Sequence, residues 1–184
     1  MSFIARLLSR DGKPIHEKWL GLSPRSMSWS ALGGCDEAEL EPKGFLSLED
    51  WKGFLGNPIE IYDAFGRLHW WGWLEAVSQY MPGMQTTYDL AKMANRVAVA
   101  FAPLEAGNPL EDGMQTSWAD DFESQALYGV KERLLRGGAL TLEQAEHWRD
   151  IELHRWRMPV LKAIPSPRKA EATIRLRCKS WIHR

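Results

Sequence analysis

Residues 58–77 read PIEIYDAFGRLHWWGWLEAV, and the pattern of this stretch decides the fold class. Two runs rich in β-branched and aromatic residues flank the turn-forming segment AFG, which predicts an antiparallel β-hairpin. Alternation along the second run gives one face Leu68, Trp70, Leu74 and Ala76, and the other face His69, Trp71, Trp73, Glu75 and Val77. The first face is apolar and is predicted to be core, with Gly72 leaving room for Trp70 to cross over. The second face mixes indoles with charge and imidazole, so we expect His69, Trp71 and Trp73 to contact a partner.

The stretches around this hairpin also predict short strands. The first 45 residues contain partly apolar runs joined by turns, with Asp11-Gly12 at the turn of a second hairpin. Ser47 is expected to cap a short helix, with Asp50 at its third position. Residues 85–101, QTTYDLAKMANRVAVAF, are predicted to continue the sheet as one or two strands.

The second half of the chain predicts two helices with a short strand between them. A helix is expected within SWADDFESQALYG, starting near Ser117 and Asp120 and stopping at Gly129. The longest helix is predicted to begin at Thr141, which forms a capping box with Gln144, and to end before Pro159. The residues expected to be structural here are Tyr128, Gly129, Trp148 and Trp156.

These elements predict an α+β, β-rich chain: an antiparallel β-barrel-like module with short helices and one longer helix in the C-terminal half. We expect a β-rich barrel or sandwich domain over residues 1–104 and a loop over 105–116. A helical segment with a short strand is expected over 117–158. The last part, 159–184, is predicted to be an extended basic tail that ends in a strand.

Charge is distributed unevenly between the tail and the rest of the chain. Residues 155–184 contain nine Lys or Arg and a single acidic residue, although the net charge of the whole chain is −1. Within ATIRLRCKSW, apolar residues alternate with Arg175, Arg177 and Lys179, which predicts a strand with one cationic face. Such a face suits either nucleic acid or, as we favour, an acidic surface on a neighbouring copy or partner.

No arrangement typical of an enzyme or metal site is present. Cys35 and Cys178 are far apart and predict free thiols, and no nucleophile motif accompanies them. His147, Asp150 and His154 share a helix face, but the charged residues around them are typical of a solvated surface. We therefore predict no catalytic residue, no cofactor and no metal. The sequence also shows neither a signal peptide nor an apolar run long enough to span a bilayer, so we expect synthesis and folding in a cytoplasm.

The order of several stretches resembles that of tail and baseplate proteins of tailed bacteriophages and prophages, in the hub or distal-tail class. The stretches are SWSALGGCDEAELE, NPIEIYDAFGRLHWWGWLEAV, ANRVAVAF, SWADDFESQALYGVKERLLRGGALTLEQAEHWRD and ATIRLRCKSW. The most distinctive pieces are a D-x-x-S-x-x-x-YG element at Asp121, Ser124, Tyr128 and Gly129, and a helix start at Thr141, Gln144 and Ala145.

The resemblance implies a virion structural protein, assembled in the bacterial host, whose copies form a ring joining the tail tube to baseplate or fibre parts. In such proteins the run RCKSW leads into a further segment. A shortened version, a fragment, or a last strand that completes a sheet in another subunit are therefore alternatives for this chain. Two other functions stay open: a carbohydrate-binding module that uses Trp71 and Trp73, and nucleic-acid binding through the basic tail.

Overall fold

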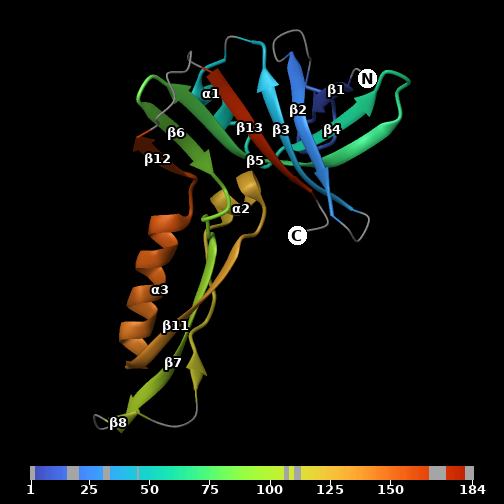
Figure 1. Cartoon of the computed structure of the whole chain (residues 1–184). Helices are drawn as coiled ribbons and strands as arrows, with labels where there is room; N and C mark the ends of the chain where they lie inside the picture. Colours follow the sequence, from blue (N-terminus) through green and yellow to red (C-terminus); the bar gives the residue numbers. More distant parts are fainter. Residues whose placement is uncertain are drawn as a thin grey trace. The chain divides into compact units, whose positions relative to one another are not determined.

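The computed structural model describes residues 3–15, 21–30, 34–44, 46–105, 108–109, 113–165 and 173–180. The chain forms two compact units, which we describe separately (Figure 1). Unit 1 comprises residues 1–91 and 161–184, and unit 2 comprises residues 92–160. The strand at 96–105, which the sequence grouped with the first domain, belongs to unit 2.

Unit 1 is a curled, eight-stranded sheet with one short helix (Figure 1). Its elements are β1 (Phe3–Leu7), β2 (Leu22–Trp29), β3 (Cys35–Pro42), α1 (Leu48–Lys52), β4 (Pro58–Asp63), β5 (Leu68–Met81), β6 (Met84–Asp89), β12 (Val160–Pro165) and β13 (Thr173–Ser180). Six strands follow the order β1-β4-β5-β13-β3-β2, each antiparallel to its neighbours. β6 pairs with β5 and β12 outside this path. The predicted β-barrel-like α+β fold is thus confirmed.

The long strand β5 organises the sheet, as the opening hairpin predicts. It pairs with β4 through its first half and with β6 through its second half. Its other edge pairs with β13, so the C-terminal strand lies inside the sheet between β5 and β3. The predicted turn at Asp11-Gly12 joins Leu8 and Pro14 in a β-bridge, and around it the Ser9 amide donates to the Lys13 carbonyl and the Ile15 amide to the Leu7 carbonyl.

The core of unit 1 is formed by the inner face of this sheet together with α1. Ser47 and Asp50 form the predicted capping box of α1, and the helix inserts a fully buried Trp51. The largest fully buried side chains of the unit are Trp51, Trp70, Leu7, Leu40, Leu55, Ile59, Ile61, Leu74, Leu90, Leu176 and Val77. At about 25 cal/mol per Å² of apolar area, this burial is the main stabilising contribution to the unit.

Gly72 lets the neighbouring strand β13 and the indole of Trp70 lie close to the backbone of β5. A Cβ atom on Gly72 would lie 2.1 Å from the carbonyl oxygen of Lys179 and 2.6 Å from Cη2 of Trp70. Both distances are far inside van der Waals contact, so only glycine fits between the core indole and the neighbouring strand.

Unit 2 is built on one strand, β7 (Arg96–Glu105). Its other elements are β8 (Asn108–Pro109), β9 (Met114–Gln115), β10 (Ala119–Asp120), α2 (Phe122–Tyr128), β11 (Glu132–Leu140) and α3 (Leu142–Trp156). β11 pairs with β7 in parallel, and β8, β9 and β10 pair with it antiparallel. A small core of Val99, Phe101 and Ala145, with Leu135, Leu140 and Trp148 against it, joins α3 to these strands.

A buried polar network fixes α2 against β7 and the end of α3. Asn95, fully buried, donates to the Gly129 carbonyl at 2.8 Å and to the Ser124 hydroxyl at 3.2 Å, and accepts from the Lys131 amide at 2.7 Å. The Ser124 hydroxyl in turn donates to the Arg157 carbonyl. Each of these buried groups depends on the others for its hydrogen bonds.

Replacing Asn95 with alanine should therefore destabilise unit 2 by about 2–3 kcal/mol, because it leaves several buried donors and acceptors unpaired. Denaturant unfolding followed by circular dichroism measures the loss. The exposed Gln115→Ala variant is the control and should change stability by less than about 0.5 kcal/mol. Equal stability of the two variants would contradict the role assigned to the network.

Candidate functional site

An exposed apolar patch lies on the outer face of β1, β4 and β5. Along the strand register, Ala5, Ile61 and Trp70 form a buried row, and Ile4, Tyr62 and Leu68 form the next row on the opposite face. Ile4 is 50% exposed, Leu68 45% and Trp71 41%, and the adjoining turn presents Phe65. We call Ile4, Phe65, Leu68 and Trp71 the apolar patch. Exposed groups of this kind mark interaction surfaces more often than isolated hydrophobic residues do.

A register shift in β5 corrects the predicted position of Leu68. Ile61 pairs with Trp70 but its neighbour Tyr62 pairs with Leu68, so His69 is an extra residue in the strand. The alternation expected from the sequence therefore breaks at His69, and Leu68 is exposed instead of sharing the core face of Trp70. Leu68 and Trp71 together line a small hollow of about 210 Å³ with Pro58, Ile59 and Glu60.

His69 holds the hairpin beside this patch. Its ring packs edge-on against Phe3, with centroids 5.4 Å apart, and its Nε2 lies 3.2 Å from Oδ2 of Asp63. The Asp63 carboxylate also accepts hydrogen bonds from the Phe65 and Arg67 amides, and from Nε of Arg67, each at 2.9 Å. The carboxylate thus fixes the turn that carries Phe65.

The stability of unit 1 should fall in acid partly because of Asp63. Burial disfavours its ionised form, but the hydrogen bonds from Arg67, His69 and Phe65 outweigh burial and hold the pKa well below its usual range. A depressed folded-state pKa stabilises the fold fully above the unfolded value, about 3.9, and this stabilisation is lost as the pH falls through the folded value. Asp63→Asn should therefore be less stable than the wild type at neutral pH and should lose less on acidification. Parallel curves of unfolding free energy against pH for the two proteins would exclude this role.

Trp73, expected with Trp71 to contact a partner, is only 5% exposed. In the register it lies between Pro58 of β4 and Lys179 of β13. The expectation of a shared indole surface is therefore corrected: Trp71 belongs to the patch, and Trp73 is buried between neighbouring strands. Trp70 and Gly72 occupy the core positions predicted for them.

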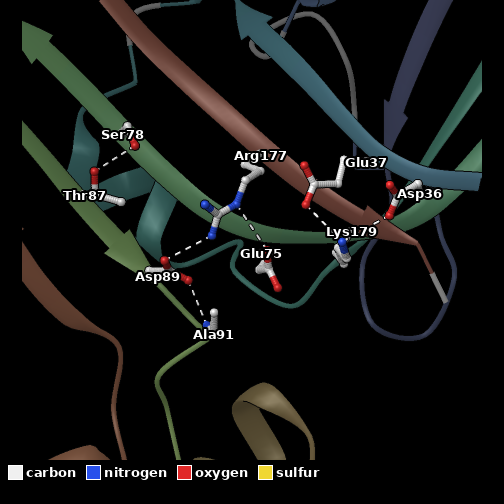
Figure 2. Close-up of polar contacts among 9 residues, drawn as sticks. All are labelled: Asp36, Glu37, Glu75, Ser78, Thr87, Asp89, Ala91, Arg177 and Lys179. Carbon is white, nitrogen blue, oxygen red and sulfur yellow. Dashed lines mark hydrogen bonds and ion pairs between the residues drawn. The ribbon is translucent and has the colours of Figure 1, made fainter. Parts of the chain in front are cut away.

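The cationic face of the last strand meets carboxylates of the same chain (Figure 2). Arg175 Nη1 lies 3.1 Å from Glu39, and Arg177 contacts Glu75 at 3.1 Å and Asp89 at 3.0 Å. Lys179 Nζ contacts Asp36 at 3.1 Å and Glu37 at 2.9 Å. We call these residues of β13, with their carboxylates on β3, β5 and β6, the charge ladder.

The charge ladder changes the interpretation of the basic strand. Arg175, Arg177 and Lys179 were expected to face an acidic partner, and the structure supplies carboxylates from strands on both sides of β13. The hydrogen bond that Lys179 donates to Glu37 outweighs desolvation and raises the pKa of Lys179, so its charge is favoured in the folded chain. On the opposite face of β13, Leu176 and Cys178 are fully buried, which confirms the predicted alternation.

The residues expected to be structural in unit 2 support its helices. Gly129 ends α2 with a φ of 72°, and Tyr128 is half-buried in the last turn. Trp148 packs on the small core. Trp156 is half-buried, donates to Glu152 at 2.8 Å and lies beside the guanidinium of Arg133.

The distinctive Asp-x-x-Ser element has a physical explanation in unit 2. Asp121 caps α2 by accepting from the Ser124 amide at 2.8 Å, and it pairs with Arg157 at 3.0 Å. The hydrogen bond from the Ser124 amide, helped by Arg157, lowers the pKa of Asp121 despite partial burial. The motif thus joins the start of α2 to the end of α3.

Among the described residues, no group of three or more His, Cys, Asp or Glu side chains is arranged to hold a metal ion. No helix in the described part of the chain is long and apolar enough to cross a membrane. No protein-family model, curated protein or solved structure matches this chain.

Proposed function

We propose that this chain is a structural subunit of a phage tail or baseplate, of the hub or distal-tail class, whose copies form a ring between the tail tube and baseplate or fibre parts. The apolar patch of Ile4, Phe65, Leu68 and Trp71 carries the proposal. The patch lies on β1, β5 and the turn before β5, where Asp63 accepts from the Phe65 amide and contacts His69, and it presents an indole and three further large apolar side chains. Buried indoles dominate the binding energy of many protein interfaces.

The order of sequence motifs supplies the second support. The stretches that resemble tail and baseplate proteins form β3, the β4–β5 hairpin, β7, the segment from α2 to α3, and β13. Copies of the chain and other tail or baseplate proteins are the proposed partners, and the virion tail is the proposed location.

The contacts of the tryptophans and cations favour assembly over the two alternatives. A sugar platform of adjacent indoles needs Trp71 and Trp73 exposed together, and Trp73 is buried. Nucleic-acid binding needs cations available for phosphate, whereas Arg175, Arg177 and Lys179 each contact a carboxylate.

The oligomeric state of the purified chain tests the proposal. Sedimentation velocity over a range of concentrations should show association, and negative-stain electron microscopy should show closed rings. A chain that stays monomeric at its highest soluble concentration, both alone and with the tail proteins encoded beside it, would contradict the proposal.

A further inference from the structure

A polar groove of about 390 Å³ lies over β13 on the face of the charge ladder. Five strands contribute to it: β2, β3, β13, β5 and β6. The lining residues are Ser26, Met27, Ser28, Glu37, Ala38, Glu39, Ala76, Ser78, Tyr80, Gln85, Thr87, Arg175, Leu176 and Arg177. Its volume lies within the range of pockets that hold small ligands.

The groove exists because short side chains occupy neighbouring positions of the sheet. In the register, Arg177 pairs with Ala76, and Arg175 pairs with Ser78, which pairs in turn with Thr87. Ala76, Ser78 and Thr87 leave space beside the long arginine side chains of β13. The adjacent strand β2 adds small hydroxyl side chains at its own edge of the hollow.

The charges in the groove are balanced by contacts within the chain. Two glutamates, Glu37 and Glu39, and two arginines, Arg175 and Arg177, line it. Arg175 contacts Glu39, and Arg177 contacts carboxylates on β5 and β6. An anionic ligand would compete with these carboxylates for the arginines, and a cationic ligand would compete with the arginines for the glutamates. The electrostatics therefore favour a ligand without net charge.

The remaining polar groups suit a ligand with many hydroxyls. The Ser78 and Thr87 hydroxyls lie 2.8 Å apart, and Gln85 Nε2 donates to Thr87 at 3.2 Å. Gln85 Nε2 also lies within 3.5 Å of the Ser78 hydroxyl, so the two hydroxyls together keep one donor and one acceptor site for a ligand, and each glutamate offers several lone pairs. At the same face, Arg175 Nε is buried without a hydrogen-bond partner among the described residues.

The strand pairing argues against an added peptide strand as the occupant. β3 lies between β2 and β13, and β5 lies between β13 and β6. Among the described residues, β3, β13 and β5 beneath the groove are therefore paired on both sides, and of the groove strands only β2 lies at an end of the sheet order.

We infer that this groove binds a neutral oligosaccharide through the hydroxyl, amide and carboxylate groups over β13. The groove uses none of the residues of the apolar patch, so ligand binding and the proposed self-association can succeed or fail separately.

Saturation-transfer NMR with the full-length chain tests the inference. Maltotriose, cellotriose and chitotriose serve as neutral probes, and trigalacturonic acid is the charged counterpart. At least one neutral trisaccharide should bind, more tightly than the charged one. Failure of all three neutral probes to bind, or binding of the charged probe alone, would overturn the inference.

Substitutions on β2 locate the binding. Ser26→Leu should narrow the groove and raise the Kd about tenfold or more, whereas Ser23→Leu, on the same strand outside the groove, should leave it unchanged. Thr87→Val, which removes a hydroxyl at nearly constant volume, should also weaken binding. Thermal melting confirms that each variant is folded. Binding that is unaffected in both folded groove variants would overturn the assignment to this site.

Discussion

Gly72→Ala is expected to destabilise unit 1 by about 3 kcal/mol or more, because the new methyl group meets backbone that cannot move independently. Its Cβ would lie 2.1 Å from the Lys179 carbonyl oxygen, so β13 and β5 would have to separate. The Trp70 indole, whose Cη2 would lie 2.6 Å from the same Cβ, cannot move away either, because it is fully buried. Urea unfolding followed by tryptophan fluorescence measures the loss.

A second glycine provides a matched control for this substitution. A Cβ on Gly138 would meet no atom within 4 Å, so Gly138→Ala should change stability by no more than about 0.5 kcal/mol. Hydrogen exchange should also show lost protection along β13 and β5 in Gly72→Ala. Wild-type stability and protection in that variant would show that the strands do not approach as described.

The tryptophans of β5 should differ sharply when each is replaced with alanine. Trp70→Ala should cost about 3–5 kcal/mol of unfolding free energy, because it removes a fully buried indole. Trp73→Ala should also cost stability, since this side chain is 5% exposed, while Trp71→Ala should cost less than about 1 kcal/mol. Thermal and denaturant unfolding of the three variants measures these differences. Equal losses at Trp70 and Trp71 would show that both faces of the strand are core.

The sequence predicts the local elements of this fold well, because local signals determine them. The capping residues Ser47 and Thr141, the terminating Gly129, and the turn between β4 and β5 act over a few positions. Hydrophobic alternation also predicts the buried face of β13, with Leu176 and Cys178 inside. These features define the β-rich α+β class without a partner strand being known.

The position of β13 could not be predicted, because strand order depends on contacts between distant residues. The acidic run of β3 and the basic run of β13 are both visible in the sequence, but nothing local pairs them. In the structure Lys179 reaches Asp36 and Glu37 across more than 140 positions. Acidic residues recur along β3 and basic residues alternate along β13, and this complementary charge pattern could have indicated that the two strands pair. The groove over β13 lies on the same charged face.

Register shifts explain the errors on β5. Strict alternation assumes one residue per position, but the strand carries an extra residue at His69 and a second shift opposite Arg177 and Cys178. After the second shift Val77, expected on the outer face, is fully buried opposite Leu176. Each shift reverses the alternation between the residues before it and those after it, so, relative to the core face of Trp70, Leu68 faces outward and Val77 faces inward.

The boundary of unit 2 is a further feature that local sequence patterns did not predict correctly. After residue 102 the composition changes to a stretch rich in Gly, Pro and acidic residues, which suggested a domain boundary there. In the structure, however, β7 pairs with β11 of the later segment. A parallel pair needs a long connection, and the residues between these strands include α2 and its polar network. Composition predicted a loop over 105–116, where the structure places β8 and β9, and it gave no information on the strands that pair with β7.

Self-association through the apolar patch is the central claim, and sedimentation velocity on three proteins tests it most directly. The wild-type chain should associate, and Trp71→Ala should raise the dissociation constant for self-association by at least about tenfold without lowering thermal stability appreciably. Trp29→Ala removes an indole that is 51% exposed outside the patch, and it should associate like the wild type. A wild-type chain that does not associate, or a Trp71→Ala variant that associates as tightly as Trp29→Ala, would contradict the account.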